Sequence, residues 1–253
     1  ASPSRFYRLA FENHPFYLIA TDGGAIGTPV ELKELLLSPG ERAEVLVRGD
    51  RESGQYRLLN LPYDRGGMEM MGMMGGGGHM MEGGMGMMQE NTQTKPHVLA
   101  TLTYQGSVSS LPLPQQLISV EELSEPKTVR RIELSMAMGS GMGMTFTFNG
   151  KAFDPNRVDT QVQLNTVEDW ELVNVDPDGM AHPFHLHVNP FQVISRNGKP
   201  EPYRAWKDTV LVKGNETVRI RIPFRDFAGK AVYHCHVLDH EDLGMMGIVE
   251  MKG

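Results

Sequence analysis

The histidines of this 253-residue chain are concentrated in two short windows, HPFHLH at 182–187 and HCHVLDH at 234–240, which hold six of the nine. Within each window, two histidines stand two residues apart: His185 and His187, and His234 and His236. This spacing places side chains on one face of a β-strand but on different faces of a helix. The windows therefore constrain the fold strongly, because two strands far apart in sequence must lie together if these histidines act jointly.

The rest of the chain consists of short β-type runs separated by turn residues. FYLIA, AEVLVR, HVLATLTY, TVRRIELSM, FQVIS and ETVRIRIPF are such runs, and DGG at 22–24 and NG at 197–198 are typical turns. No long helical stripe interrupts them. Runs recurring at roughly 8–12-residue spacing are typical of β-sandwiches. We therefore predict an all-β fold.

A Pro-punctuated stretch without alternation, residues 108–127, divides the chain. It predicts a linker between a first domain at 1–107 and a second at 128–253. The first domain is short for a complete sandwich. The chain opens ASPSRFYRLAF, with neither an initiator Met nor a leader, and residues 5–11 already have the pattern of a strand. We expect a first domain truncated at its N-terminus, in a fragment or a processed chain.

Composition excludes several classes of partner. The net charge of −7 argues against nucleic acid and against an anionic membrane surface. No apolar run approaches the ~18 residues of a membrane span. A single cysteine allows no internal disulfide, so cystine content says nothing about the compartment.

One segment is of low complexity. Residues 66–88 contain ten Met and ten Gly among 23 residues, and MAMGSGMGM at 136–144 is a smaller echo. An inert linker is the simpler interpretation, although linkers normally use Ser and charged residues instead of thioethers. Because thioether sulfur suits Cu(I), we favour a copper-gathering loop. Its candidate ligands are Met68, Met70, Met71, Met73, Met74, His79, Met80 and Met81.

The residue types around Cys235 indicate which metal would bind. On a strand, His234 and His236 share one face and Cys235 points to the other. Structural zinc favours several thiolates, which this chain lacks. A thiolate, two imidazoles and a distant thioether are the blue-copper set, supplied here by Cys235, His182, His240 and Met245. The four imidazoles on the opposite face imply further copper.

With these motifs the sequence resembles the multicopper oxidases, in particular bacterial laccases and cuprous oxidases with Met-rich insertions. The resemblance is carried by HPFHLH at 182–187, HCHVLDHEDLGMM at 234–246, FNGKAFDP at 148–155 and WKDTV at 206–210. FYLIATDGG and SPGERAEVLVR resemble the family's middle domain. The resemblance implies three cupredoxin-like domains, each a Greek-key sandwich, of which this chain would hold the third and most of the second.

The resemblance also implies roles for the ligands. His182, Cys235, His240 and Met245 look like the type 1 ligands; His185 resembles the type 2 ligand, and His187, His234 and His236 the type 3 ligands. The family passes single electrons from a reducing substrate through type 1 copper to a trinuclear cluster that reduces O2 to water, with four copper ions in the complete enzyme. Cys235 would hand electrons through its own backbone to the flanking histidines.

The chain departs from the family in one respect. The family's cluster uses four His-x-His pairs, and two of these come from its first domain. This chain has two pairs, since His14, His79 and His97 are isolated. We therefore expect an N-terminal domain or chain of the same enzyme to supply the remaining histidines. The family resemblance also implies a periplasmic or secreted location.

Two acids and a methionine are further candidates. Glu241 resembles the family's acid that delivers protons to bound oxygen; alternatively it is an exposed carboxylate. Asp178 and Met180 resemble the substrate-copper site of cuprous oxidases, or they steer an imidazole, or Asp178 is simply a turn residue of VDPDG.

The leading hypothesis for function is an oxidase that takes electrons from phenols, aromatic amines or Cu(I). The alternative is a blue-copper electron-transfer or copper-sequestering protein without turnover, which would not need histidines on both sides of its cysteine. Copper nitrite reductase, a third possibility, lacks that His-Cys-His arrangement.

Overall fold

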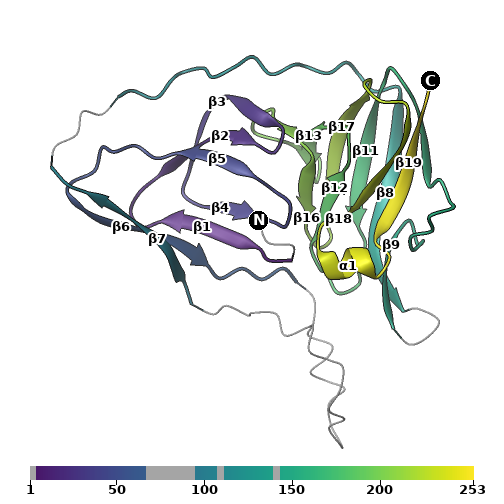
Figure 1. Ribbon diagram of the computed structural model, residues 1–253, viewed down its shortest axis with the longest axis horizontal. Coiled ribbons are helices and arrows are strands. Elements are labelled where there is room, and N and C mark those ends of the chain that lie inside the picture. The colour runs from purple at the N-terminus through teal and green to yellow at the C-terminus, as the bar shows by residue number, and fades with distance from the viewer. Residues whose placement is uncertain (1–3, 67–94, 107–110, 139–142) are drawn as a thin grey trace, which may run out of the picture.

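The computed structural model describes residues 4–66, 95–106, 111–138 and 143–253 (Figure 1). In these ranges the regular structure is β-strand, apart from one short helix, α1 (Leu238–Asp242). The predicted all-β class is confirmed. α1 has five residues, and nothing helical in the described ranges has the length and apolar character needed to cross a bilayer.

The first seven strands form two sheets, which we call the N-terminal sheets. One has the order β4-β1-β6-β7 and the other β3-β2-β5. Their bounds are β1 Tyr7–Phe11, β2 Phe16–Thr21, β3 Gly24–Leu32, β4 Leu35–Leu37, β5 Ala43–Leu46, β6 Gly54–Leu61 and β7 His97–Tyr104. β2 alternates buried and half-buried residues, as a strand with one covered face should. β3 was not predicted, because its first residue Gly24, the internal Gly27 and a proline hide the alternation.

The remaining strands form two larger sheets, the C-terminal sheets. Their orders are β10-β19-β18-β12-β16 and β14-β13-β17-β11-β8-β9, with β15 also paired to β13. The bounds are β8 Thr128–Met138, β9 Met144–Phe148, β10 Thr160–Gln163, β11 Thr166–Asn174, β12 His182–Leu186, β13 Phe191–Arg196, β14 Lys199–Pro200, β15 Trp206–Lys207, β16 Thr209–Val212, β17 Thr217–Phe224, β18 Gly229–Cys235 and β19 Met246–Lys252.

A single apolar core lies between the two C-terminal sheets. Trp170 of β11 is fully buried, and its ring centroid lies 5.6 Å from that of Tyr233 on β18. Cys235 and Met245 belong to the same core cluster, so the predicted copper ligands are embedded in packed side chains. β11 was not predicted because it carries the buried acids Glu168 and Asp169, which are paired with arginines of β8 and β17.

Residues 111–127 have no regular structure and run from the N-terminal to the C-terminal sheets (Figure 1). Along the way Leu117 N–H donates to the Gly27 carbonyl of β3, at 2.9 Å, and Gln192 of β13 donates to the Glu121 carbonyl, at 2.8 Å. The segment therefore bridges the two pairs of sheets. The predicted domain boundaries at 107 and 128 stay predictions.

The β2–β3 turn joins the N-terminal sheets to β15. Thr21 Oγ1 and Gly23 N–H both donate to the Trp206 carbonyl, at 2.7 and 2.9 Å. A Cβ on Gly23 would lie 2.5 Å from that carbonyl oxygen, so the approach requires glycine. This contact holds the N-terminal sheets beside β16, the neighbour of the histidine-bearing strand β12.

Candidate copper centre

The pairing of β12 with β18 brings the two histidine windows together. In register, Phe184 faces Cys235 and His185 faces His234. Directly opposed residues of an antiparallel pair project to the same side of the sheet. His185 and His234 therefore share one side, while Cys235 projects to the other, the side that His182 reaches two residues before Phe184. The strand ends at Cys235, so His236 lies just beyond it and donates its N–H to the Pro183 carbonyl, at 2.8 Å.

Helix α1 follows β18 and contains His240, which is buried. The His240 N–H donates to the Val237 carbonyl at 3.0 Å, Met245 N–H donates to the His240 carbonyl at 2.9 Å, and Cys235 N–H donates to the Met245 carbonyl at 3.0 Å. These bonds close a compact loop that contains Cys235, His240 and Met245, three of the four predicted type 1 ligands. The helix was not predicted, because five residues are too few to show a helical stripe.

Cys235, His182 and His240, which we call the Cys–His cluster, converge on one buried point. His182 Nδ1 lies 3.1 Å from His240 Nδ1, and Cys235 Sγ lies 3.5 Å from His240 Nδ1 and 3.9 Å from His182 Nδ1. Since bonds from imidazole and thiolate to a first-row metal are ~2.0–2.3 Å long, small adjustments would let all three donors reach one ion. The donor set fits copper.

Burial shapes the protonation of this cluster. It raises the pKa of the Cys235 thiol to about 12. Burial, together with the nearby His182 and Arg65, lowers the pKa of His240 to about 2. The pocket therefore favours a neutral imidazole. A bound cation would favour the thiolate, because coordination deprotonates a thiol.

Asp176 holds His182 in position. Its Oδ2 lies 3.1 Å from His182 Nε2, and both side chains are inaccessible to solvent. Burial by itself would raise the pKa of Asp176, but the hydrogen bond from His182 is among the contacts that hold it below its ordinary value. With Nε2 donating to the carboxylate, Nδ1 is left unprotonated toward Cys235.

Asp176 was missed from sequence, although the two aspartates of VDPDG were the available signal. Asp178, the predicted candidate, lies half-buried and donates its backbone N–H to Asp176, at 2.9 Å. Met180 is buried in the core cluster directly before the stretch that leads to His182.

Phe146 and Met245 complete the surroundings of His240. The Phe146 ring stacks on the His240 ring with centroids 3.9 Å apart and planes 13° apart. Met245 is fully buried, and its backbone bonds to both Cys235 and His240. Its role as axial ligand stays a prediction.

The second cluster, which we call the imidazole cluster, consists of His185, His187, His234 and His236. Its adjacent ring centroids lie 4.7–5.6 Å apart. His187 Nε2 and His234 Nε2 face each other at 3.0 Å. Burial, reinforced by the neighbouring imidazoles, lowers the pKa of His187 to about 4, and burial also lowers the pKa of His234. Neutral imidazoles with converging nitrogens are suited to bind metal.

Glu241 contacts the imidazole cluster directly. Its Oε2 lies 3.2 Å from His234 Nδ1, which also lies 2.9 Å from the Cys235 carbonyl oxygen. The Glu241 side chain keeps 31% of its surface exposed, so the carboxylate connects the cluster with solvent.

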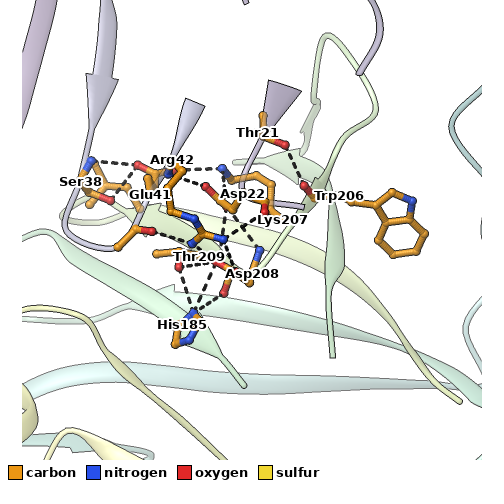
Figure 2. A network of polar contacts seen from close by, with 12 residues as sticks. Thr21, Asp22, Ser38, Glu41, Arg42, His185, Trp206, Lys207, Asp208 and Thr209 are labelled. Carbon is orange, nitrogen blue, oxygen red and sulfur yellow. Dashed lines mark hydrogen bonds and ion pairs between the residues drawn. The ribbon is translucent and has the colours of Figure 1, made fainter. Parts of the chain in front are cut away.

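Two residues of the WKDTV stretch, Asp208 and Thr209, hold His185 in place. Its Nδ1 lies 2.9 Å from the Asp208 carbonyl oxygen and 3.0 Å from Thr209 Oγ1, both in the WKDTV stretch (Figure 2). Burial alone would raise the pKa of Asp208, but hydrogen bonds from His185, Arg42 and Thr209 hold it well below its ordinary value. The signal available in the sequence was the acid in WKDTV, a stretch that carries the family resemblance.

The other histidines lie apart from both clusters or outside the described residues. His14 is buried, and its Nε2 lies 2.8 Å from Tyr104 Oη and 3.0 Å from the Arg48 carbonyl oxygen. His97 is the exposed first residue of β7. The predicted Cu(I) ligands Met68, Met70, Met71, Met73, Met74, His79, Met80 and Met81 lie outside the described residues.

Known proteins share this arrangement of sequence. Two models of multicopper oxidase domains match, one over residues 126–252 and the other over residues 2–70. A multicopper oxidase of Staphylococcus haemolyticus is 30% identical over 243 residues, which cover 94% of this chain and 43% of the relative. A laccase of Bacillus subtilis is 26% identical over 97% of this chain and 48% of its own length.

Solved structures agree. A multicopper oxidase from Campylobacter jejuni, described as a metallo-oxidase, superposes with a TM-score of 0.81 at 33% identity, covering all of this chain and 52% of that one. The predicted cupredoxin-like fold is thereby confirmed. The chain spans about half the length of these relatives. Since one family model alone accounts for half of its residues, the chain belongs to the multicopper oxidase family, whose cofactor is copper.

Proposed function

We propose that this chain provides the type 1 copper site, and four of the histidines of the trinuclear cluster, in an oxidase that passes single electrons from a reducing substrate to O2. The observation that carries the proposal is the adjacency of the two clusters. Cys235 belongs to one, and His234 and His236 on either side of it belong to the other.

The Cys–His cluster supports the type 1 assignment. Cys235, His182 and His240 would hold copper, with Met245 as the weak axial donor. Copper in such a site supplies reversible one-electron chemistry. Asp176 orients His182, and the packed core around Phe146 excludes water from the donors.

The imidazole cluster supports a second copper centre reached through the strand. We assign His185 to type 2 copper and His187, His234 and His236 to type 3 copper. Cys235 is joined to His234 and His236 by single peptide bonds, so the path between the centres is short and covalent. A protein that only carried electrons, or only stored copper, would not need this second set of imidazoles, which is why we favour the oxidase over that alternative.

Glu241 is suited to supply protons. Reduction of O2 to water consumes protons, and this carboxylate lies within reach of both solvent and His234. We propose that Glu241 moves protons from solvent to the face of the imidazole cluster.

The remaining histidines of a complete cluster would come from an N-terminal domain or chain of the same enzyme. In the described ranges, His14 and His97 are the histidines outside the two clusters, and neither is near them in the fold. By family resemblance we place the enzyme in the periplasm or outside the cell, with O2 as acceptor.

For the reducing substrate we propose phenols, aromatic amines or Cu(I). A structural contact supports Cu(I): the backbone of Gly66, the first residue of the Met-rich segment, packs on Gly179, and Ala181 N–H donates to the Arg65 carbonyl at 2.9 Å. The segment therefore starts beside Asp178 and Met180, the candidate substrate-copper residues. The residue that Gly66 contacts, Gly179, is three residues before His182 in the chain. Thioethers from this segment would deliver the soft ion there.

The test compares this chain alone with the same chain supplied with the N-terminal part of the enzyme. Copper added to the chain alone should give the intense blue absorption of a type 1 site but no O2 consumption. The complemented protein should consume O2 with a phenol or Cu(I) as donor. A blue complex that remains unable to reduce O2 when complemented would favour the electron-transfer alternative, and the lack of any blue absorption would refute the type 1 assignment.

A further inference from the structure

The loop 38–42, between β4 and β5 of the N-terminal sheets, reaches the imidazole cluster at Gly40. This glycine has a φ of 81°, and a Cβ on it would overlap Cδ2 of the His236 ring and lie 2.7 Å from its Cγ. Non-bonded carbons prefer a separation of ~3.5–4.0 Å. The backbone of the loop therefore limits where the His236 ring can lie, and only glycine permits so close an approach.

Arg42 of the same loop reaches the other end of the cluster through Asp208. Its guanidinium makes two bonds to the Asp208 carboxylate, at 2.8 and 2.6 Å, and also donates to the Gly40 and Asp22 carbonyls, at 2.9 and 3.0 Å (Figure 2). A planar guanidinium bonded at two points fixes the orientation of a carboxylate, which a lysine cannot do.

Asp208, which Arg42 holds, and its neighbour Thr209 provide both hydrogen-bonding partners of His185 Nδ1. Thr209 Oγ1 donates its hydrogen to Asp208 Oδ1, at 2.8 Å, so toward His185 the hydroxyl can only accept. The Asp208 carbonyl can also only accept. Since both lie within 3.0 Å of His185 Nδ1, that nitrogen must be the donor, and Nε2 is left free to bind a metal.

The loop is itself firmly anchored. Glu41 Oε2 accepts from the Ser38 N–H and hydroxyl, at 3.0 and 2.8 Å, which closes the turn. Lys207 lies 3.0 Å from Asp22 and 3.3 Å from Glu41, joining the turn to the strand just before Asp208. Figure 2 shows these contacts as one continuous network between the two pairs of sheets. Such a network resists small displacements of its members.

We propose that loop 38–42 is a positioning element for the trinuclear cluster: Gly40 sets the place of the His236 ring by contact, and Arg42 holds Asp208, which with Thr209 orients the His185 ring. The inference rests on the proposed function for the identity of the metal, but the positioning itself is a property of the copper-free chain. A loop of the N-terminal sheets thereby positions two predicted copper ligands that lie on or directly after strands of the C-terminal sheets.

The first experiment uses the copper-free chain, so it does not depend on oxidase activity. Long-range proton–nitrogen NMR of the histidine rings reports each tautomer. We expect His185 to be protonated on Nδ1 in the parent protein and its ring resonances to shift in Arg42→Met, because Asp208 loses the guanidinium that orients it. Arg57→Met is the matched control, because Arg57 makes an equally exposed two-point bond to Glu12 within the N-terminal sheets. A parent His185 protonated on Nε2, or unchanged His185 ring resonances in Arg42→Met, would overturn the inference.

Gly40→Ala tests the contact with His236. Gly198→Ala is its control, since Gly198 has a φ of 76° but no atom within 4 Å of a Cβ placed on it. We expect both variants to lose similar stability from the backbone, and only Gly40→Ala to shift the His236 ring resonances. Equal spectra for the two variants would refute the contact. Should Gly40→Ala not fold, Arg42→Lys, at a half-exposed side chain, provides a milder disturbance of the same loop.

A second readout uses the complete, copper-loaded enzyme. Removal of a ligand's hydrogen-bonding partner typically weakens metal binding ~10–100-fold. We expect Arg42→Met to lose type 2 copper selectively on dialysis against chelator and to alter the type 2 EPR signal, with the type 1 signal retained. Loss of both signals together would indicate general unfolding and contradict a positioning role. Shifted His185 ring resonances in a protein that binds no copper would instead refute the proposed function alone.

Discussion

Replacement of Asp176 by asparagine should weaken copper binding at the Cys–His cluster while leaving the fold intact. The carboxylate of Asp176 accepts from His182 Nε2, at 3.1 Å, from the Asp178 N–H, at 2.9 Å, and from the backbone of Met180. Asparagine is almost the same size but has one acceptor oxygen. In Asp176→Asn, either His182 or Asp178 therefore loses its acceptor.

The magnitude follows from burial. An unsatisfied buried polar group costs ~1–3 kcal/mol, and His182 is inaccessible to solvent, so we expect a loss of this size in the stability of the copper-free chain. If the amide group faces His182, the imidazole is driven toward protonation on Nδ1, the nitrogen that faces Cys235. We expect copper affinity to fall ~10–100-fold, as for other partners of metal ligands. The loss of a negative charge beside the site should also raise the reduction potential, because it disfavours Cu(II).

The assay is chelator competition, followed by the blue absorption, with urea unfolding of the copper-free protein measured in parallel. Asp169→Asn is the control: Asp169 is equally buried and accepts from Arg219 and Arg221, on the sheet opposite the site. It should lose stability but keep its copper affinity. Asp176→Asn with the parent affinity and potential would refute the reasoning that Asp176 sets the state of His182.

The pH dependence of stability provides an independent check on the role of Asp176. The pKa of Asp176 is lowered in the fold from an ordinary value of 3.8. Its contribution to stability is therefore present above that value and is lost as the pH falls through the lower, folded pKa. The difference in stability between the parent protein and Asp176→Asn should narrow in acid, and a difference that widened would contradict the assigned hydrogen bond between His182 and the Asp176 carboxylate.

Four further outcomes are expected. Cys235→Ser should abolish the blue absorption and substrate oxidation together, because a hydroxyl cannot replace the soft thiolate. Met245→Leu should keep the colour and raise the reduction potential; an unchanged potential would place the axial ligand elsewhere, with Met246 the first candidate. Because the pKa of His240 is lowered from 6.5 to about 2, the copper-free protein should lose stability as the pH falls from 6.5 toward 2, by about 1.4 kcal/mol per unit, measured as urea midpoints at several pH values; a flat profile would contradict a buried neutral imidazole. Deletion of 66–88 should lower Cu(I) oxidation and leave or improve phenol turnover in steady-state kinetics, whereas equal losses on both substrates would assign the segment to the fold or the electron path.

The ligand types and their grouping could be predicted from sequence, because they depend on local spacing. Histidines two residues apart, as on either side of Cys235 and at 185 and 187, point to the same face of a strand. A lone thiolate with imidazoles selects copper over zinc. The short β-runs likewise predicted the all-β class without any knowledge of the pairing.

Elements that break the local pattern were not predicted. β11 carries buried acids that only their partners on β8 and β17 make acceptable, and α1 is too short for a period to emerge. β3 was hidden by its glycines and proline. For β11 the stabilising contacts come from residues distant in the chain, which a window of sequence does not contain.

The residues that orient the ligands were decided by tertiary structure alone. VDPDG contains two aspartates, and only the fold brings Asp176 and not its neighbour against His182. Arg42 and Gly40 lie more than 140 residues before the histidines they affect, and no spacing rule connects them. A ligand is recognisable in sequence because its chemistry resides in its own side chain. A residue that orients a ligand acts through a hydrogen bond or a contact of a few ångströms, and that proximity exists only once the two pairs of sheets have packed together.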